Sequence, residues 1–307
     1  MDNVKLTKKQ IINDYFSKIV FWSNLKLLNF RMIASGELKD TIPMWNRLAI
    51  ELHSDCNRNC FFCARYADTS GIRKYKNGSH VKKKMPTWKV KDIINQVNEL
   101  GYSGSTGFHR LSEPLLDDRY VELASYAKIK GLKVMEDTNA DVLEKNPDLI
   151  KKIDGLVSRL QIGLYDYKNN AEKKQQMSYW KKKFKKTGIV FSLAAEYPII
   201  RINSKFDLDG KLYINDIVKH YPCFWPMYGL WIRYDGEISL CCEDDQCNFG
   251  LGNVFDTSIK DIWLSKKHIE IAKNLKKFNG RLNYELCRKC NFDGFIPVTG
   301  LNKKIVK

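Results

Sequence analysis

Three cysteines stand within eight residues of one another in the segment ELHSDCNRNCFFCARYA, residues 51–67. They are Cys56, Cys60 and Cys63, in a C-x3-C-x2-C pattern. Short loops with this spacing can place three thiolates on three irons of a cubane iron–sulfur cluster and leave the fourth iron free. A zinc site that borrows His53, or three buried cysteines without a metal, are the alternatives. The absent fourth ligand favours a cluster that keeps one position open for chemistry.

A second group of four cysteines lies in the last third of the chain. Its spacing is C-x17-C, then a gap, then C-x2-C, and Gly236 stands five residues before the second cysteine. Four thiolates from a hairpin and a distant C-x-x-C loop can close either a tetrahedral zinc site or a cubane, and spacing alone leaves both open. The four residues are Cys223, Cys241, Cys287 and Cys290.

The composition is that of an ordinary soluble protein, with 44% hydrophobic and 28% charged residues in a chain of 307. The first residues, MDNVKLTKKQ, lead into an amphipathic segment rather than an apolar signal sequence, and no apolar run is long enough to span a membrane. These features predict a cytoplasmic protein. In a reducing compartment, nine cysteines are better explained as metal ligands or catalytic thiols than as disulfides.

The formal net charge of +17 raises the question of a nucleic-acid partner. The lysines are spread over many short clusters, and no stretch interleaves them with aromatic residues as a stacking platform would. We interpret most of them as solvated faces, which disfavours nucleic acid and leaves an anionic substrate or partner as the alternative. A zinc- or iron–sulfur-containing nucleic-acid binder is the competing function from a different class.

Strand and helix patterns alternate from residue 46 onward. Buried apolar runs separated by amphipathic segments indicate a parallel sheet with helices outside, here a partial (β/α)6 TIM-like barrel in the α/β class. Chemistry in such barrels gathers at the carboxyl ends of the strands, and the first cysteine group follows the first strand. The expected strands are 46–52, 104–109, 132–138, 156–165 and 189–196, with 199–203 as a candidate sixth; the expected helices are 86–100, 117–131, 141–152 and 171–188.

Three segments are expected along the chain. Residues 1–45 form a helical extension, for which a partner-binding or membrane-surface role is the alternative to packing on the main domain. Residues 46–215 form the barrel. Residues 216–307 form a smaller hairpin-plus-helix module, because GLWIRYDGEISLCC reads as two strands joined by an Asp-Gly turn and a helix is expected over 258–277.

The first motif resembles the hallmark of the radical SAM superfamily, in which C-x3-C-x2-C follows the first barrel strand. The resemblance implies a 4Fe–4S cluster whose open iron binds the amino and carboxylate groups of S-adenosylmethionine. An electron from a donor such as flavodoxin or ferredoxin then yields a 5′-deoxyadenosyl radical, which abstracts a hydrogen atom from substrate carbon. The positioning of the sulfonium against a low-potential cluster is the physical core of this chemistry.

Other landmarks of that superfamily are present in altered form. LSEPLL, residues 111–116, stands where the family has Gly-Gly-Glu-Pro, with the carboxylate kept for the methionine ammonium. DTNA, residues 137–140, resembles the TNG at the end of the third strand. Polar residues that merely cap helices at strand ends are the alternative explanation. The implied S-adenosylmethionine contacts are Phe62, Ser112, Glu113, Thr138, Asn139, Gln161 and Glu196.

The second cysteine group resembles the SPASM/twitch module that follows radical SAM barrels. GLGNVFDTSIKDIW, residues 250–263, is similar to the segment between the cysteine groups of that module. No cysteine follows Cys290, which favours the twitch form with one auxiliary 4Fe–4S cluster. The resemblance spans about residues 46–295 and implies metal ligation by the four cysteines of the second group.

Two further cysteines, Cys242 and Cys247, are inert thiols, a substitute ligand, or a hydrogen-atom donor to a substrate radical. Arg201 is a candidate for binding a hydroxyl group or accepting its proton. The resemblance implies that a small polar sugar or aminocyclitol is oxidised, or is epimerised if a thiol returns a hydrogen atom. Modification of a ribosomal peptide and electron transfer between two clusters are the alternatives; the open iron disfavours the second.

Overall fold

The computed structural model describes residues 42, 44–60, 62–63, 82–193, 218–290 and 292. Within these ranges the strands form one sheet in the order β5-β4-β3-β2-β1-β6-β7-β8. All neighbours from β5 to β6 are parallel, and β7 and β8 continue the sheet antiparallel. The strands are β1 (Arg47–Ile50), β2 (Ser105–Gly107), β3 (Lys133–Thr138), β4 (Arg159–Gly163), β5 (Gly188–Ser192), β6 (Gly229–Ile232), β7 (Glu237–Ser239) and β8 (Gly252–Asn253).

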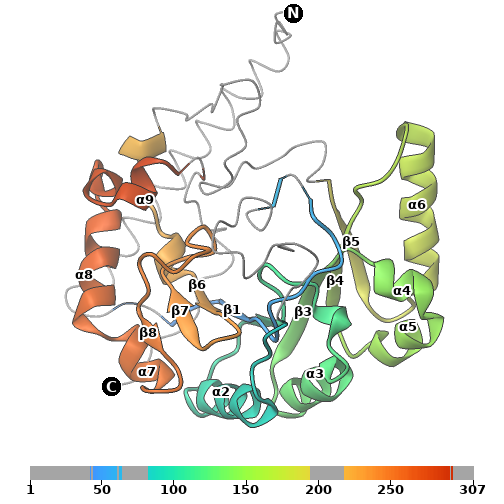
Figure 1. Cartoon of the computed structure of the whole chain (residues 1–307), viewed down its shortest axis with the longest axis horizontal. Helices are drawn as coiled ribbons and strands as arrows, with labels where there is room; N and C mark the ends of the chain where they lie inside the picture. Colours follow the sequence, from blue (N-terminus) through green and yellow to red (C-terminus); the bar gives the residue numbers. More distant parts are fainter. Residues whose placement is uncertain are drawn as a thin grey trace, which may run out of the picture.

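Helices follow the strands and lie along the outer side of the sheet (Figure 1). Gly101 (φ 69°) and Gly131 (φ 79°) adopt the left-handed conformation just after α2 and α3 and turn the chain back toward the next strand. The helices are α2 (Thr87–Glu99), α3 (Tyr120–Ile129), α4 (Asp141–Lys145), α5 (Pro147–Ile153), α6 (Asn170–Lys183), α7 (Ile259–Trp263), α8 (Lys266–Leu275) and α9 (Glu285–Arg288).

Two helices that the sequence pattern predicts as continuous are each divided. The expected helix over 141–152 is α4 followed by α5, because Pro147 disfavours the helical conformation at Asn146, whose side chain caps α5 instead. The expected helix over 258–277 is α7 followed by α8, with Ser265 between them accepting a hydrogen bond from the backbone N–H of His268. Both predictions of a single helix were wrong at these positions.

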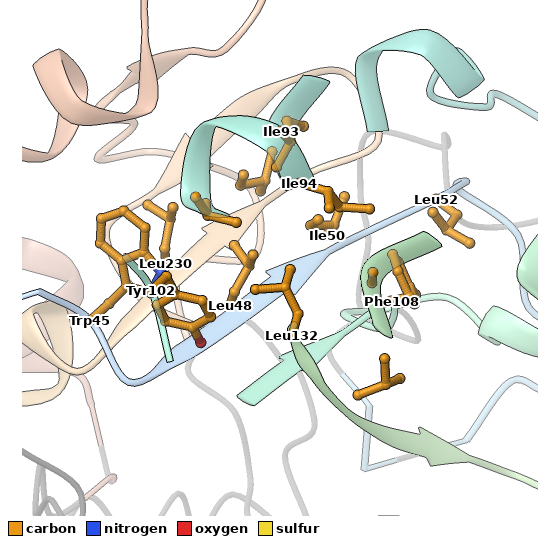
Figure 2. Close-up of a cluster of buried hydrophobic side chains, with 14 of the residues drawn as sticks. Trp45, Leu48, Ile50, Leu52, Ile93, Ile94, Tyr102, Phe108, Leu132 and Leu230 are labelled. Atoms are coloured by element: carbon orange, nitrogen blue, oxygen red, sulfur yellow. The ribbon is translucent and has the colours of Figure 1, made fainter. Parts of the chain in front are cut away.

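One cluster of buried hydrophobic residues includes both the barrel strands and the β6–β7 hairpin. Leu48 and Ile50 of β1 are fully buried against Ile93 and Ile94 of α2, and Leu230 of β6 lies in the same cluster (Figure 2). Trp45, two residues before β1, packs with Tyr102 and Trp263 at ring-centroid distances of 5.7 and 4.9 Å. The hairpin region is therefore packed into the core of the barrel region.

Strand β6 occupies the edge of β1 that faces away from β2. Arg47, Leu48, Ala49 and Ile50 pair in parallel with residues 229–232, so the hairpin β6–β7 extends the barrel sheet rather than forming a sheet of its own. The candidate sixth strand at 199–203, residues 1–41 of the expected extension 1–45 and the expected boundary near residue 216 lie outside the described residues. The division into three segments stays a prediction. No helix in the described ranges is long and apolar enough to cross a membrane.

Candidate functional site

The first cysteine group lies on the loop that follows β1. Cys56, Cys60 and Cys63 are half-buried, and the backbone N–H of Cys63 donates to the carbonyl of Cys60 at 3.0 Å. Burial raises the pKa of Cys60 to about 12, and the neighbouring Cys63 and Cys56 add to the rise because like charges repel. The structure therefore gathers the three predicted ligands into one group.

An arginine inside the cysteine motif fixes this loop. Arg58 donates to both carboxylate oxygens of Asp141, at 2.8 and 2.5 Å, and to Asp166 at 2.5 Å. Asp141 begins α4 and Asp166 follows β4, so the loop is held to the ends of two strands of the sheet. The sequence-based predictions did not include Arg58, although its position between Cys56 and Cys60 could have indicated a role in holding the loop.

Glu113 is the centre of a hydrogen-bond network beside the cysteine loop. Its carboxylate accepts from Thr138 Oγ1 at 2.7 Å, from the Asn139 backbone N–H at 2.8 Å and from Leu115 N–H at 3.2 Å. Burial raises the pKa of Glu113 to about 7 even though these hydrogen bonds oppose the rise. The backbone N–H of Glu113 donates to the carbonyl of Asp55 at 3.0 Å, which places the network against the cysteine loop.

Asn139 connects this network to the first cysteine. Its Nδ2 lies 4.0 Å from Cys56 Sγ and donates to Asn57 Oδ1 at 2.8 Å. Three of the residues predicted from the LSEPLL and DTNA segments, Glu113, Thr138 and Asn139, are therefore brought together at the carboxyl end of β3. A buried carboxylate with amide and hydroxyl donors around it can receive the ammonium group of an amino acid.

Two aromatic rings also belong to the surroundings of the cysteine loop. Phe62 packs against Tyr165 at a ring-centroid distance of 5.1 Å, and Arg58 lies over the Tyr165 ring at 5.6 Å. Burial raises the pKa of Tyr165, and the nearby Cys60, Cys63, Glu113 and Asp137 raise it further. Tyr165, which the sequence reading missed, thus marks the point where the cysteine loop and the network meet.

The remaining predicted contacts of S-adenosylmethionine do not take part in the Glu113 hydrogen-bond network of the described residues. Ser112 Oγ is buried without a hydrogen-bond partner among the described residues. Gln161 is half-buried on β4, opposite Asp137 in the strand register. Glu196 and Arg201 lie outside the described residues.

The second cysteine group encloses a cavity. Cys223, Cys241, Cys287 and Cys290 all line it. Burial and the neighbouring Cys223 raise the pKa of Cys287 to about 12. The structure therefore brings together all four predicted ligands, which come from the loops before β6, after β7 and around α9. The rest of the wall is mainly apolar and includes Trp225, Pro226, Leu240, Leu286 and Phe292.

A buried arginine holds these loops in place. Arg281 is fully buried, and its guanidinium donates to the carbonyl oxygens of Tyr221 at 3.0 Å, Phe292 at 2.7 Å and Pro222 at 3.4 Å. It thus ties the segment before Cys223 to the segment after Cys290. The sequence reading missed this residue as well.

The geometry bears on the zinc alternatives. Zinc needs its thiolates within about 2.3 Å of one ion, whereas each thiolate of a cubane binds a different iron. In the described ranges, no three His, Cys, Asp or Glu side chains converge closely enough to hold a single metal ion. His53 Nδ1 accepts a hydrogen bond from Asp55 N–H at 3.0 Å, whereas its Nε2 is buried without a hydrogen-bond partner among the described residues.

Comparisons with known proteins agree with this geometry. Residues 223–291 match the SPASM family, an iron–sulfur cluster-binding domain. An S-adenosyl-L-methionine-dependent 2-deoxy-scyllo-inosamine dehydrogenase of Niallia circulans is 24% identical over 259 residues, 81% of this chain and 93% of that relative. The crystal structure of BtrN in complex with AdoMet and 2-DOIA matches with a TM-score of 0.64 and 22% identity, over 82% of this chain and 95% of BtrN. That of anSMEcpe with bound AdoMet matches with a TM-score of 0.50 and 14% identity, over 81% of this chain and 85% of that chain.

The chain shares the fold of BtrN, and its residues 223–291 match the SPASM iron–sulfur cluster-binding domain. The SPASM match includes all four cysteines of the second group, so the predicted fold class and the predicted module are confirmed. The prediction that these four residues bind an auxiliary cluster agrees with the description of the matched domain.

Two cysteines of the SPASM domain are not themselves part of the described cavity lining, although Cys242 contacts residues that are. Cys242 Sγ accepts from Trp225 Nε1 at 3.0 Å and donates to Glu243 Oε1 at 3.5 Å. Cys247 adopts a left-handed backbone conformation (φ 55°), and burial raises its pKa to about 11. Among the described residues, neither belongs to the lining of the cavity.

An arginine from the barrel region connects the two sites. Arg110 follows β2, and its guanidinium donates to Ser239 Oγ at 2.7 Å and to the carbonyl oxygens of Asp244 at 2.6 Å and Asp245 at 3.3 Å. Ser239 ends β7, two residues before Cys241. The loop after β2, which also carries Glu113, is therefore fixed directly to the SPASM domain.

Proposed function

We propose that the protein is a radical SAM dehydrogenase that oxidises a hydroxyl group of a small polar substrate of the sugar or aminocyclitol class. The observation that carries this proposal is the presence of two groups of cysteines around one sheet. The first is an open group of three, and the second is an enclosed group of four. The likeness to an S-adenosyl-L-methionine-dependent 2-deoxy-scyllo-inosamine dehydrogenase supports the choice of substrate class.

Each thiol group would hold one 4Fe–4S cluster. With S-adenosylmethionine bound, the first cluster would supply the chemistry that removes a hydrogen atom from the substrate. The second cluster would accept one electron. Cys56, Cys60 and Cys63 would be the ligands at the first site. Their loop is held by the hydrogen bonds of Arg58 to Asp141 and Asp166.

The network around Glu113 would orient the amino acid portion of S-adenosylmethionine. A pKa of about 7 means that the carboxylate and the carboxylic acid are both populated near neutral pH in the free protein. An incoming ammonium group stabilises the carboxylate by direct charge pairing. Thr138 and Asn139 hold the carboxylate in place through two of its hydrogen bonds, and Phe62 with Tyr165 would exclude water beside it.

Oxidation is favoured over epimerisation by the surroundings of Cys242. A thiol that quenches a substrate radical must point its S–H bond at the substrate. The Cys242 thiol is instead engaged with Trp225 and Glu243. The second site, in contrast, has the closed ligand set that electron acceptance requires. Modification of a peptide side chain is the second candidate for the substrate, and we keep it as an outcome of the test.

The proposal includes an external one-electron donor of the flavodoxin or ferredoxin type and a reducing, cytoplasmic setting. Both follow from the low potential that the first cluster needs and from thiols that must stay reduced. Arg201 and Glu196 belong to this proposal as candidate substrate or S-adenosylmethionine contacts.

The test begins with anaerobic reconstitution and measurement of iron and sulfide. The reduced protein is then incubated with S-adenosylmethionine and 2-deoxy-scyllo-inosamine deuterated at its ring carbons. We expect one ketone per 5′-deoxyadenosine, with deuterium transferred into 5′-deoxyadenosine. An epimer in place of the ketone would contradict the oxidation, and zinc without sulfide would contradict the whole assignment. If S-adenosylmethionine is cleaved but this aminocyclitol does not react, a peptide becomes the next substrate to test.

A further inference from the structure

Four charged side chains form an ionic cluster on the sheet: Arg47, His109, Glu136 and Asp137. Arg47 begins β1, His109 follows β2, and the two carboxylates belong to β3. His109 Nδ1 contacts Glu136 Oε1, and His109 Nε2 lies 2.9 Å from Asp137 Oδ2. Arg47 reaches His109 Nε2 at 2.8 Å and Asp137 at 3.6 Å.

The two ring nitrogens of His109 have different partners, and this difference defines their roles. Glu136 is fully buried, and its other oxygen accepts from Phe108 N–H at 2.8 Å. The Glu136 carboxylate accepts at Nδ1 and favours a proton on that nitrogen, against the backbone N–H of Asp137, which lies 3.3 Å from the same atom. Nε2 faces both a donor, Arg47, and an acceptor, Asp137. The neutral ring accepts from Arg47 and the charged ring donates to Asp137, so Nε2 can gain or lose a proton without ring rotation.

The backbone of β2 is shaped to receive this ring. A Cβ atom at Gly107 would lie 2.8 Å from His109 Cε1 and 2.7 Å from the carbonyl of Met135, so only glycine leaves room for the imidazole there. The side of the ring toward Glu136 is closed, with none of the Glu136 side chain exposed, whereas the Asp137 side chain is 34% exposed. The face that exchanges a proton is therefore the accessible one.

The ionic cluster is connected toward both thiol groups through neighbouring residues. Asp137 is near enough to Tyr165 to raise its pKa, as are Cys60, Cys63 and Glu113 of the first site. Arg110, the residue after His109, reaches Ser239 and Asp244 beside the second site. A substrate that gives a hydrogen atom to one side and an electron to the other would occupy the region beside this cluster.

We propose that His109 Nε2, assisted by Asp137, accepts the hydroxyl proton of the substrate as its carbon is oxidised. The inference deepens the proposed function and rests on it. The carbon loses its hydrogen atom to the abstractor at the first site, and its O–H bond breaks as the proton moves to Nε2. The remaining electron leaves for the second site, and the C=O bond forms. His109 becomes an imidazolium paired with Asp137. Arg47 and Glu136 are positioning residues.

The charges around His109 predict how the step depends on pH. Burial lowers the pKa of His109, but Asp137 and Glu136 outweigh it and raise the pKa to about 9. Arg47 from β1 faces the same nitrogen, and Arg159 from β4 acts on Asp137. The neutral ring that can accept a proton is thus the minor form near neutral pH, and ketone formation should rise as pH approaches about 9.

The first experiment measures ketone per 5′-deoxyadenosine in the holoenzyme, from about pH 6 to about pH 10, with 2-deoxy-scyllo-inosamine as the probe. We expect His109→Gln to lower the ketone yield by about 100-fold or more and keep cleavage of S-adenosylmethionine. Asp137→Asn should shift the rise in ketone to lower pH. His220→Gln is the matched control, because His220 is exposed and its ring pairs with Asn279 at 2.7 Å, away from the ionic cluster. A wild-type ketone yield in His109→Gln, or a parallel loss of ketone and 5′-deoxyadenosine, would overturn the proposal.

The second experiment needs no substrate. The chain has five histidines, so ¹⁵N-histidine NMR of the oxidised holoenzyme can assign His109 by comparison with His109→Gln. We expect Nε2 to titrate near pH 9 while Nδ1 stays protonated, with a lower midpoint in Asp137→Asn. A midpoint near 6.5 would overturn the inference. If the wild type makes no ketone from the probe but Nε2 titrates as expected, the choice of substrate fails and the proton-exchanging nitrogen stands.

Discussion

The two thiol groups use the same ligand in opposite surroundings. The first has three half-buried cysteines on a loop bordered by polar groups, with Asn139 beside Cys56 and the Glu113 network next to the loop. The second has four cysteines around a cavity whose wall is mainly apolar, and Cys287 and Cys290 are buried. An open, polar site suits the binding of a charged small molecule, whereas an enclosed, apolar site suits storage of an electron.

The means by which each region is held in place differ in the same way. Arg58 holds the first loop through two carboxylates, Asp141 and Asp166, and the Asp166 side chain is 72% exposed. Arg281 holds the second through backbone carbonyl oxygens and is fully buried. A surface ion pair weakens with salt and gives way more easily than a buried, fully hydrogen-bonded arginine. The first site is thus the more adaptable of the two.

The largest effect is expected at the open site. Cys60→Ala removes one of three ligands from a cluster that has no spare thiolate, so formation of 5′-deoxyadenosine should fall below detection. Iron content should drop by about half, because the second cluster is held by other residues. Both quantities are measured on anaerobically reconstituted protein. Retained 5′-deoxyadenosine formation would contradict the role given to the first group.

The next effect is expected at the enclosed site. Cys290→Ala should lower the ketone yield per 5′-deoxyadenosine by more than about tenfold, the effect that even a change beyond the ligands has on metal sites. Cleavage of S-adenosylmethionine should continue, because the first site is intact. Product analysis of the same reaction mixture gives both numbers. Equal loss of the two products would mean that the sites are not functionally separate, and the comparison drawn above would fail.

A smaller effect is expected from Glu113→Gln. The change replaces a charge-assisted contact with a neutral one, which should weaken the binding of S-adenosylmethionine about 10- to 100-fold. Wild-type affinity should also fall as pH drops below about 7, because protonated Glu113 no longer pairs with an ammonium group. The variant should lack this pH dependence. Equilibrium binding from about pH 6 to about pH 8 measures both.

Glu122→Gln is the matched control for that experiment. Glu122 lies on α3 and pairs with Lys91 at an exposed position. Its loss should leave the affinity for S-adenosylmethionine and its pH dependence unchanged. An equal weakening in the two variants would show that Glu113 acts only through general electrostatics.

Sequence patterns were sufficient for the features that local spacing encodes. The cysteine spacings and the LSEPLL and DTNA segments led to residues that the structure places together. They could not show that β6 pairs with β1, because residues 47–50 and 229–232 are far apart in the chain and nothing local specifies which edge a strand takes. For the same reason the His109 cluster was missed: a lone histidine after one strand acquires its meaning from two acidic residues on another.

The smallest effect is expected from the two cysteines outside the cavity wall. Cys242→Ala and Cys247→Ala should keep cleavage of S-adenosylmethionine and the ketone product, because the Cys242 thiol is held by Trp225 and Glu243 and neither residue lines the cavity among the described residues. Chiral chromatography of the product, with deuterium from solvent as a label, detects any returned hydrogen atom. Solvent deuterium at the reacting carbon in the wild type, lost in either variant, would make that thiol a hydrogen donor. The enclosed site would then be a support for epimerisation rather than the acceptor of the second electron.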